Sequence, residues 1–526
     1  MRMAKKIRLL PCRLRLGPQL FLYTALVALV ILFLYGLLSF HNENSQHRSR
    51  ISGIVQLKPY LDNIIDNSPP KLVNTTHFVA AILVICATRP GALKNHLDQL
   101  IQDEKFGSNA GLDSINPGLD LDLGLGLLKT QAWTGLGPEN QVQVQAGPRP
   151  WHRPSPTSFP ILISQDGHMS VVQDVASSFV KSNKGIFHMQ HVQIKPATGK
   201  KSNYALIAEH YKWALDKTFN SGYDTVIVTE DDLDIGADFF SYFTWSKNIL
   251  QKDNSLWCVS AWNDNGLPSL IDKTRADKVW RTDFFPGLGW MLFASLWNEL
   301  SPNWPSIYWD DWMRRPEIRQ GRSCLRPEIS RTAHNMKLAG KGSSNGLYKK
   351  FLSEISAAQE SIDFSLLPHE PLLEKYYDQN MQKALSEALV VNISEIADFK
   401  WNPTHQYRVA FENTRQWFNL AKSLGIMVDI RGGMMRTAYK SVISVMHKGC
   451  RLHIHPHTLN IENIGSWTYE PDWDKMYRYL EFESVYCKIG KYEGKCNPYS
   501  DEMKQWFEKK RWTKRLAGWG EMIVIP

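Results

Sequence analysis

The sequence contains no two cysteines with only two residues between them, although it has seven cysteines in 526 residues. Closed zinc sites such as zinc ribbons need thiolate pairs at that spacing, so the sequence excludes this class of site. Cys12 precedes a long apolar segment, and the other six cysteines follow it. In an oxidising compartment those six have the capacity to form disulfides. They are Cys86, Cys258, Cys324, Cys450, Cys487 and Cys496.

Acidic residues are absent before residue 40, whereas six Lys and Arg residues lie there. Removing those six charges from the formal net charge of +9 leaves only +3 for the rest of the chain. Proteins that follow a nucleic-acid backbone concentrate basic residues in their folded part. The charge distribution therefore excludes a nucleic-acid partner.

Formal charge is also absent from Leu20–Leu38, nineteen consecutive and mostly apolar residues. As a helix with a rise of about 1.5 Å per residue, this segment would span roughly the 30 Å hydrocarbon core of a bilayer. Basic residues precede it and no small-residue cleavage pattern follows it, which predicts a signal anchor with its N-terminus in the cytosol. We expect a cytosolic tail at 1–17, a transmembrane anchor at 18–40 and a stem at 41–76.

Three continuous apolar runs predict strands that are buried on both faces. Segments with helical spacing, Ala92–Gln102 and Tyr204–Thr218, lie between them. This alternation predicts an α/β fold with a mostly parallel sheet and a ligand site at the carboxyl ends of the strands. The runs are Ala80–Ile85, Phe159–Ile163 and Thr225–Val228, and polar residues follow the second and third of them.

The remaining composition divides the chain further. Residues 103–158 contain a glycine-rich, low-complexity stretch and a proline-rich stretch, which favours an insertion without chemistry of its own. We expect a catalytic domain at 77–400 that includes this insertion. A small C-terminal domain at 401–460 and a tail of unknown role at 461–526 complete the predicted organisation.

Three adjacent carboxylates, Glu230, Asp231 and Asp232, follow the third apolar run. Such neighbours repel one another unless a cation offsets them, and their oxygens suit Mg²⁺ or Mn²⁺ shared with a diphosphate. Strand alternation predicts that Glu230 and Asp232 lie on one side and Asp231 on the other. The alternative is a loop in which an aspartate caps the next helix, but the buried strand before the triplet favours the metal site. Arg89 and Asp166 follow the other two strands and are either nucleotide-binding or surface turn residues.

Two further carboxylates, Asp310 and Asp311, lie between Trp309 and Trp312. Indole walls would make a partly dry pocket, in which burial raises the basicity of a carboxylate and suits it to act as a general base. The alternative is a helix N-cap with tryptophans in the core.

Two weaker patterns complete the candidates. Gly340–Gly346 is rich in glycine and serine, and its backbone N–H groups could wrap a phosphate, although such loops are often simply irregular. His453, His455 and His457 alternate along one predicted strand. An exposed strand face is favoured over a metal site there, because no acidic residue lies nearby.

The residues around these candidates resemble the N-acetylglucosaminyltransferase I family. The resemblance covers roughly residues 77–102 and 159–457 and leaves the insertion and the tail outside. Its longest stretches are His210–Leu215, Val228–Phe243, Ser255–Gly266, Trp280–Trp290 and Trp309–Thr332.

The resemblance implies a GT-A-type nucleotide-sugar-binding domain with a small C-terminal domain on a single-pass membrane anchor. It implies that Asp232 is the direct Mn²⁺ ligand and that Asp310 is the catalytic base. Glu230 and Asp231 would contact the sugar portion of the UDP-GlcNAc donor. The remaining positions carried over are Arg89, Asp166 and His210 for the donor, Ser344 in a loop that orders over it, and the disulfide pair Cys258 and Cys324.

One departure concerns the family's first disulfide, which would join a cysteine near Cys86 to one directly after Asp166. Gly167 stands at the second position here. We therefore expect this bridge to be absent.

The function implied by the resemblance is the inverting transfer of GlcNAc, in β1,2 linkage, to the α1,3-arm mannose of high-mannose N-glycans on glycoproteins. The expected location is the Golgi membrane, with single-pass type II topology and a lumenal catalytic part. The alternatives are β1,2-GlcNAc transfer to protein O-mannose and an inactive glycan-binding homologue.

Overall fold

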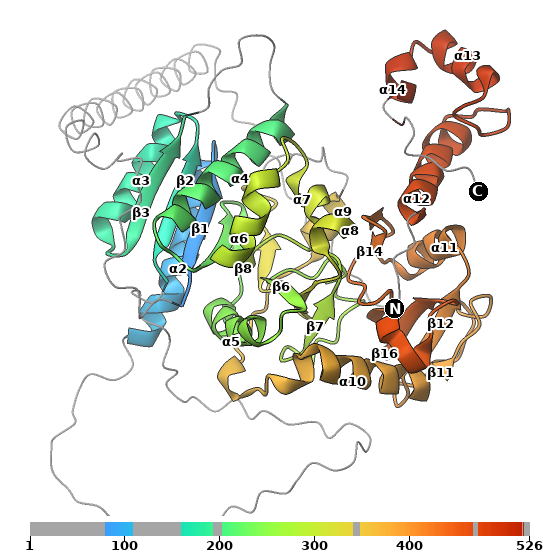
Figure 1. Ribbon diagram of the computed structural model, residues 1–526, viewed down its shortest axis with the longest axis horizontal. Helices are drawn as coiled ribbons and strands as arrows, with labels where there is room; N and C mark the ends of the chain where they lie inside the picture. Colours follow the sequence, from blue (N-terminus) through green and yellow to red (C-terminus); the bar gives the residue numbers. More distant parts are fainter. Residues whose placement is uncertain are drawn as a thin grey trace, which may run out of the picture. The chain divides into compact units, whose positions relative to one another are not determined.

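The computed structural model describes residues 79–108, 159–192, 202–339, 348–466, 472–517 and 519 (Figure 1). The predicted cytosolic tail, membrane anchor and stem lie outside the described residues, as does most of the predicted insertion. None of the helices that the structure describes is both long and apolar enough to cross a membrane.

The larger sheet in the described part of the chain has eight strands and is mostly parallel, as the apolar runs predict. Its first four strands are parallel neighbours, and β8 and β7 run in the opposite direction. In spatial order the strands are β3 (Ile186–His191), β2 (Ile161–Asp166), β1 (Ala81–Cys86), β4 (Thr225–Glu230), β8 (Trp290–Phe293), β6 (Leu256–Ser260), β9 (Ser323–Pro327) and β7 (Val279–Thr282).

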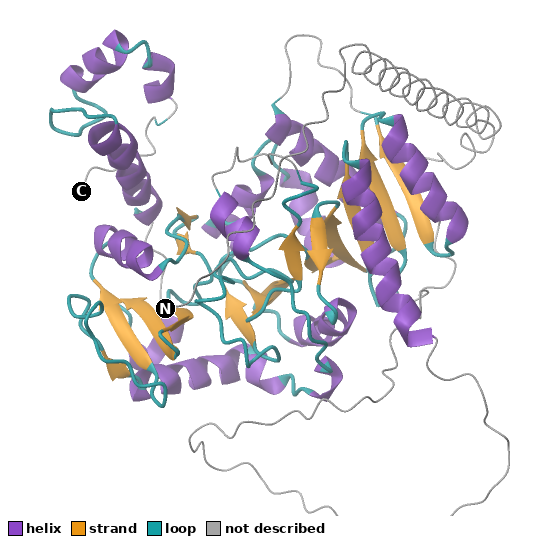
Figure 2. Ribbon diagram, turned by 180° about the vertical axis from the view of Figure 1, so that it is seen from behind, coloured by secondary structure: helices purple, strands orange, loops and turns teal. Residues whose placement is uncertain are grey.

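Helices cover both faces of this sheet (Figures 1 and 2). Alternate residues of β1 point to opposite faces, so Ile82 and Val84 belong to one hydrophobic core, whereas Ala81 and Leu83 belong to the other. On the first face lie α2 (Pro90–Ser108), α3 (Ser170–Ser182) and α5 (Phe239–Lys252); on the second lie α4 (Asn203–Asn220), α6 (Ala294–Leu300) and α7 (Trp309–Met313).

The order of the strands reverses between β1 and β4. From β1 the chain moves to β2 and β3 on one side and then returns to β4 on the other. In open α/β sheets ligands bind at such a point, outside the carboxyl ends of the strands. The fold therefore places Arg89, which follows β1, and the acidic triplet, which ends β4, at the expected ligand crevice.

A second sheet has its own core around Trp417 and Ile454. Its histidines contradict the prediction of an exposed face, because His453 and His455 are each only 2% exposed. The ring of His453 contacts the Ser444 hydroxyl and the Gln406 side chain. In spatial order the strands are β11 (Leu389–Val390), β12 (Tyr407–Phe411), β16 (Cys450–Pro456) and β15 (Ile443–His447), with α11 (Thr414–Leu424) packed against them.

A tight hairpin joins β13 (Ile430–Arg431) to β14 (Met434–Met435). Its two central residues, Gly432 and Gly433, have φ angles of +54° and +72°, which a type I′ turn requires and glycine adopts without strain. The Gly433 N–H donates to Asp474 in α12 (Trp473–Phe482), with the nitrogen and oxygen 2.6 Å apart.

The end of α12 and the tail that follows it form a small aromatic core around Phe482 and Phe507, and a disulfide between Cys487 and Cys496 closes a loop of the tail. The other described elements complete the fold. They are β5 (Leu233–Ile235), β10 (Thr332–His334), α8 (Pro316–Arg319), α9 (Lys349–Glu354), α10 (Glu374–Glu387), a π-helix (Glu483–Ile489), α13 (Asp501–Lys509), α14 (Thr513–Ala517) and the 3₁₀ turns Ser301–Asn303, Phe364–Leu366, Glu370–Leu372 and Ile461–Ser466.

Candidate active site

The acidic triplet lies at the end of β4, as its sequence position predicts. The strand stops at Glu230, and Asp231 and Asp232 form the turn that leads into β5. Alternation therefore does not continue through the triplet. The prediction that Asp231 and Asp232 face opposite sides is wrong, because both contact the guanidinium of Arg89.

Arg89 is the counter-ion of this turn. Its Nη2 donates to Asp231, and its Nη1 donates to Asp232 and to the carbonyl oxygen of Ala339, the last at 3.0 Å. The guanidinium bridges the crevice between β1 and β4 and offsets the repulsion between two neighbouring carboxylates. The predicted role of Arg89 in donor binding is thus accompanied by a direct contact with the acids.

His334 is a member of the site that the sequence does not reveal. The antiparallel pairing of β10 with β5 aligns His334 with Leu233, next to the acidic turn. The His334 Nε2 lies 3.2 Å from Asp232 Oδ2. Burial lowers the pKa of His334, but the hydrogen bond and the charge of Asp232 outweigh burial, so the pKa is raised. Burial likewise raises the pKa of Asp232, but His334 and Arg89 together lower it below its usual value.

The other two acids bind protons more readily. Burial, and then the charge of Asp232, raise the pKa of Glu230, although the Tyr211 hydroxyl donates a 2.7 Å hydrogen bond to it. Burial raises the pKa of Asp231 to about 7 against the opposing effect of Arg89. Crowded, buried carboxylates of this kind are typical of sites that receive a cation.

Two oxygens of the turn fit a divalent metal. Asp231 Oδ2 and Asp232 Oδ1 are buried and have no hydrogen-bond partner in the described part of the chain. Buried polar atoms are normally satisfied, so this pair indicates a place for a ligand. Carboxylate oxygens are the donors that Mg²⁺ and Mn²⁺ prefer.

Asp310 and Asp311 lie in the first turn of α7, and both accept from Arg314 Nη1, at 2.9 and 2.8 Å. Their side chains are 47% and 41% exposed. Both carboxylates are thus about half-exposed, and the predicted indole walls around the base are wrong, because Trp309 and Trp312 are buried in the core. Trp309 instead packs into the core, where its ring stacks on Trp304 and other aromatic rings.

Tyr211 links this helix to the acidic turn. Its ring lies 4.4 Å from the ring of Trp309, and its hydroxyl contacts Glu230. Burial raises the pKa of Tyr211 well above its usual value, and the charges of Glu230, Asp232 and Asp310 add to this effect. Asp232 and Asp310 therefore act on one buried hydroxyl, from two different elements.

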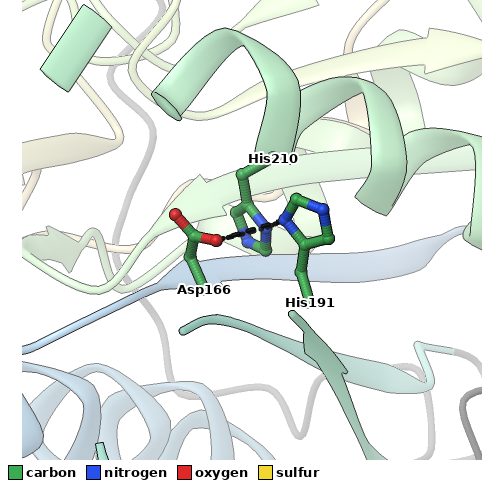
Figure 3. A group of neighbouring side chains, drawn as sticks. All are labelled: Asp166, His191 and His210. Atoms are coloured by element: carbon green, nitrogen blue, oxygen red, sulfur yellow. Dashed lines mark hydrogen bonds and ion pairs between the residues drawn. The ribbon is translucent and has the colours of Figure 1, made fainter. Parts of the chain in front are cut away.

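Asp166, His191 and His210 form a second cluster at the carboxyl end of the sheet (Figure 3). Asp166 ends β2, His191 ends β3, and His210 projects from α4. Asp166 Oδ1 lies 3.1 Å from His191 Nδ1 and 3.6 Å from His210 Nδ1. Burial lowers the pKa of His210 to about 4. Sequence analysis places Asp166 and His210 in the site but misses His191, because only half of β3 is apolar.

Two predictions about the cysteines are confirmed: the pair that the resemblance implies, and the missing bridge that the departure at Gly167 implies. Cys258 and Cys324 form a disulfide between register partners in β6 and β9. Cys86 is buried and has no disulfide partner among the described cysteines. Ser344 and the rest of Gly340–Gly346 lie outside the described residues.

Part of the sequence is similar to a curated protein. An alpha-1,3-mannosyl-glycoprotein 2-beta-N-acetylglucosaminyltransferase of Arabidopsis thaliana is 34% identical over 299 residues, which are 56% of this chain and 65% of that protein. The chain thus spans slightly less than two thirds of the length of this curated relative.

Similarity to solved structures is weak. A mannosyltransferase from Pyrobaculum calidifontis, in complex with GDP-Man and Mn²⁺, matches 53% of this chain and 64% of its own, with a TM-score of 0.26 and 11% identity. A mannose-1-phosphate geranyltransferase from Thermus thermophilus matches 54% of this chain and 70% of its own, with a TM-score of 0.19 and 11% identity. At these scores neither structure bears on the activity.

The family assignment rests on a different comparison. The family model of the GNT-I family matches residues 150–472. That match includes α7, the acidic turn and His334, and it spans more than half of the 526 residues. The chain belongs to the GNT-I family.

Proposed function

We propose that the chain transfers GlcNAc from UDP-GlcNAc, in β1,2 linkage and with inversion, to the α1,3-arm mannose of high-mannose N-glycans on glycoproteins. Membership of the GNT-I family and the name of the Arabidopsis relative support this reaction. The observation that carries the proposal is the acidic turn at the strand-order reversal, which Tyr211 joins to the helix of Asp310 by its hydrogen bond to Glu230 and its ring contact with Trp309. This reaction begins the conversion to hybrid and complex N-glycans.

In this proposal the donor binds over the carboxyl ends of β1, β2 and β4, as in a GT-A-type domain. Asp232 would hold Mn²⁺, which when bound supplies positive charge to the departing diphosphate. Glu230 and Asp231 would contact the sugar. Arg89, Asp166 and His210 would hold the nucleotide part, and Ser344 would lie in the loop that orders over it.

Asp310 is the proposed catalytic base. It takes the proton from the mannose 2-hydroxyl while that oxygen forms a bond to the anomeric carbon of GlcNAc and the bond from this carbon to the UDP oxygen breaks. Its half-exposed position at the start of α7 is open to a large acceptor. A single base suffices because the leaving group departs as an anion; a glycosidase instead needs a second carboxylic acid to protonate its leaving group.

The proposed setting is the Golgi membrane, with the anchor at 18–40 and the catalytic part in the lumen. Residues 77–400 would form the catalytic domain, and 401–460 the small C-terminal domain. Transfer to protein O-mannose is the nearest alternative, and offering both acceptors to the purified protein separates the two. An inactive glycan-binding homologue would release no UDP when given Mn²⁺ and both substrates.

The test of the base compares Asp310→Asn with Asp311→Asn. Both carboxylates contact the same Arg314 nitrogen and have similar exposure, so the second variant controls for loss of charge beside Arg314. We expect Asp310→Asn to abolish transfer and retain UDP-GlcNAc binding, while Asp311→Asn keeps most of the transfer rate. Transfer by Asp310→Asn at the rate of the unmodified protein would refute the assignment.

The test of the metal ligand is separate. Asp232→Ala is expected to weaken Mn²⁺-dependent binding of UDP-GlcNAc, because it removes a buried oxygen that has no other partner among the described residues. Isothermal titration calorimetry measures this affinity. An unchanged affinity would count against Asp232 as the ligand.

A further inference from the structure

The cluster of Asp166, His191 and His210 has the dimensions of a metal site. Three distances define it: 3.1 Å from Asp166 Oδ1 to His191 Nδ1, 3.6 Å from the same oxygen to His210 Nδ1, and 3.2 Å between the two nitrogens. Ligands at three corners of a tetrahedron, each about 2.0–2.1 Å from Zn²⁺, are roughly 3.3–3.4 Å apart. The triangle drawn by the three side chains therefore matches tetrahedral coordination without rearrangement (Figure 3).

The surroundings of His210 accommodate the tautomer that binds metals. Its Nε2 lies 3.2 Å from the backbone carbonyl oxygen of Ser164, which can only accept a hydrogen bond. In the tautomer that donates from Nε2 to this oxygen, the lone pair of Nδ1 points toward Asp166 and His191, and the Ser164 hydroxyl, also 3.2 Å from Nε2, is a second possible acceptor. A ligating histidine typically donates its other ring N–H to such a carbonyl.

Both imidazoles of the cluster are buried. His210 is 2% exposed and His191 is 7% exposed, and burial holds His210 neutral by lowering its pKa to about 4. Metal ions bind the neutral imidazole. The ring of His191 packs against both His210 and Trp213, with ring centroids 5.3 and 4.9 Å away, and these contacts restrict its orientation.

The donor set indicates which ion fits. Two imidazole nitrogens and one carboxylate oxygen suit Zn²⁺, whereas Mg²⁺ and Mn²⁺ prefer oxygen donors alone. The acidic turn at Asp231 and Asp232 offers such oxygens. The two clusters thus have different metal preferences.

We propose that Asp166, His191 and His210 form a zinc-binding site with three protein ligands. Its fourth position would be open to solvent or a small ligand, because His191 also lines a cavity of about 630 Å³ walled by Trp213 and Trp304. The site does not depend on the proposed function. The further expectation that Zn²⁺ competes with UDP-GlcNAc does rest on the proposed function, because that function assigns Asp166 and His210 to the donor.

The experiment titrates the full-length protein with Zn²⁺ alone, without nucleotide or acceptor, by isothermal titration calorimetry. Replacement by Co²⁺ gives a second readout, because tetrahedral Co²⁺ absorbs visible light far more strongly than octahedral Co²⁺. We expect His191→Gln and Asp166→Asn each to weaken Zn²⁺ binding by more than about 100-fold, since losing even an outer partner of a ligand costs roughly 10–100-fold. Both variants are also expected to lose the tetrahedral Co²⁺ spectrum.

Two matched variants serve as controls. His188→Gln changes another buried histidine of β3, which contacts Gln165 instead of the cluster, and should bind Zn²⁺ normally. His334→Gln removes the imidazole at the acidic turn and should also bind normally. Retained binding in both His191→Gln and Asp166→Asn, or loss of binding in His334→Gln alone, would overturn the proposal. Because no transfer is measured, a failed proposal on catalysis leaves this result unaffected.

Discussion

Gly432, in the β13–β14 hairpin, packs against the backbone of Arg314, whose side chain contacts the candidate base. A methyl group at this position would clash with the carbonyl oxygen of Arg314 and lie 2.7 Å from its carbonyl carbon, whereas ordinary contact begins at 3.4 Å. Both obstructing atoms are backbone and cannot rotate away. Arg314 holds Asp310 and Asp311, so the Gly432→Ala substitution acts directly on the support of the proposed base.

The expected magnitude has two parts. A left-handed φ of +54° costs a residue with a side chain roughly 1–2 kcal/mol. Relieving the clash adds about 1–3 kcal/mol, as for other cases of overpacking. Gly432→Ala should therefore lower the free energy of unfolding by about 2–5 kcal/mol. Because displacement of a catalytic group by about 1 Å can reduce a rate roughly 100-fold, transfer should fall far more than stability alone explains.

Gly425→Ala is the matched control. Gly425 also has a positive φ, +76°, but an added methyl group there meets no atom within 4 Å. It should show only the backbone part of the loss, about 1–2 kcal/mol, and normal transfer below its melting temperature. Denaturant titration and initial transfer rates measure both quantities. Equal losses of stability and equal rates in the two variants would refute the argument that the contact with Arg314 positions the base.

Two other predictions concern buried charge. Asp238→Asn should lower the free energy of unfolding, measured by denaturant titration, by about 3–5 kcal/mol, because it leaves the fully buried guanidinium of Arg331 without its ionic partner. The control Asp501→Asn, which removes one partner of an exposed ion pair, should change this free energy little. Burial lowers the pKa of His96 to about 4 and that of His453 to about 3, so below pH 6.5 the unfolded chain binds protons that the folded chain refuses. Stability should fall as the pH drops from 6.5 to 4, by up to about 1.4 kcal/mol per pH unit for each histidine. Urea titrations at several pH values in this range give the free energy of unfolding. For His453→Gln this free energy should change less steeply with pH than for the unmodified protein. An equally steep pH dependence would contradict the assignment of the effect to His453.

The parts of the fold that sequence analysis predicts are those with continuous apolar runs. β1, β2 and β4 are recognisable because both of their faces are buried in the core. β3 is not recognisable as a continuous apolar run, because three of its six residues are polar. Those residues are buried all the same, since neighbours satisfy them: His188 contacts Gln165, and Gln190 donates to the carbonyl oxygen of Gly167.

The candidate site is predictable in its composition but not in its internal contacts. Asp231 and Asp232 are identifiable from their place after a buried strand. Their contact with Arg89 joins positions more than 140 residues apart, and that of Asp232 with His334 depends on a three-residue pairing of strands. No local spacing encodes such contacts. The same limit explains why Trp309 beside Asp310 is as consistent with a pocket wall as with the core.

The hydrogen bond from Gly433 to Asp474 has a practical consequence for any shortened version of the protein. Similarity to the family ends at residue 472, two positions before this carboxylate. A chain trimmed at that boundary would keep every side chain assigned to chemistry, yet it would release the hairpin tip that rests on Arg314. Truncated proteins intended for assays or crystallisation should therefore retain at least α12, because sequence similarity marks where residues are shared and not where mechanical support ends.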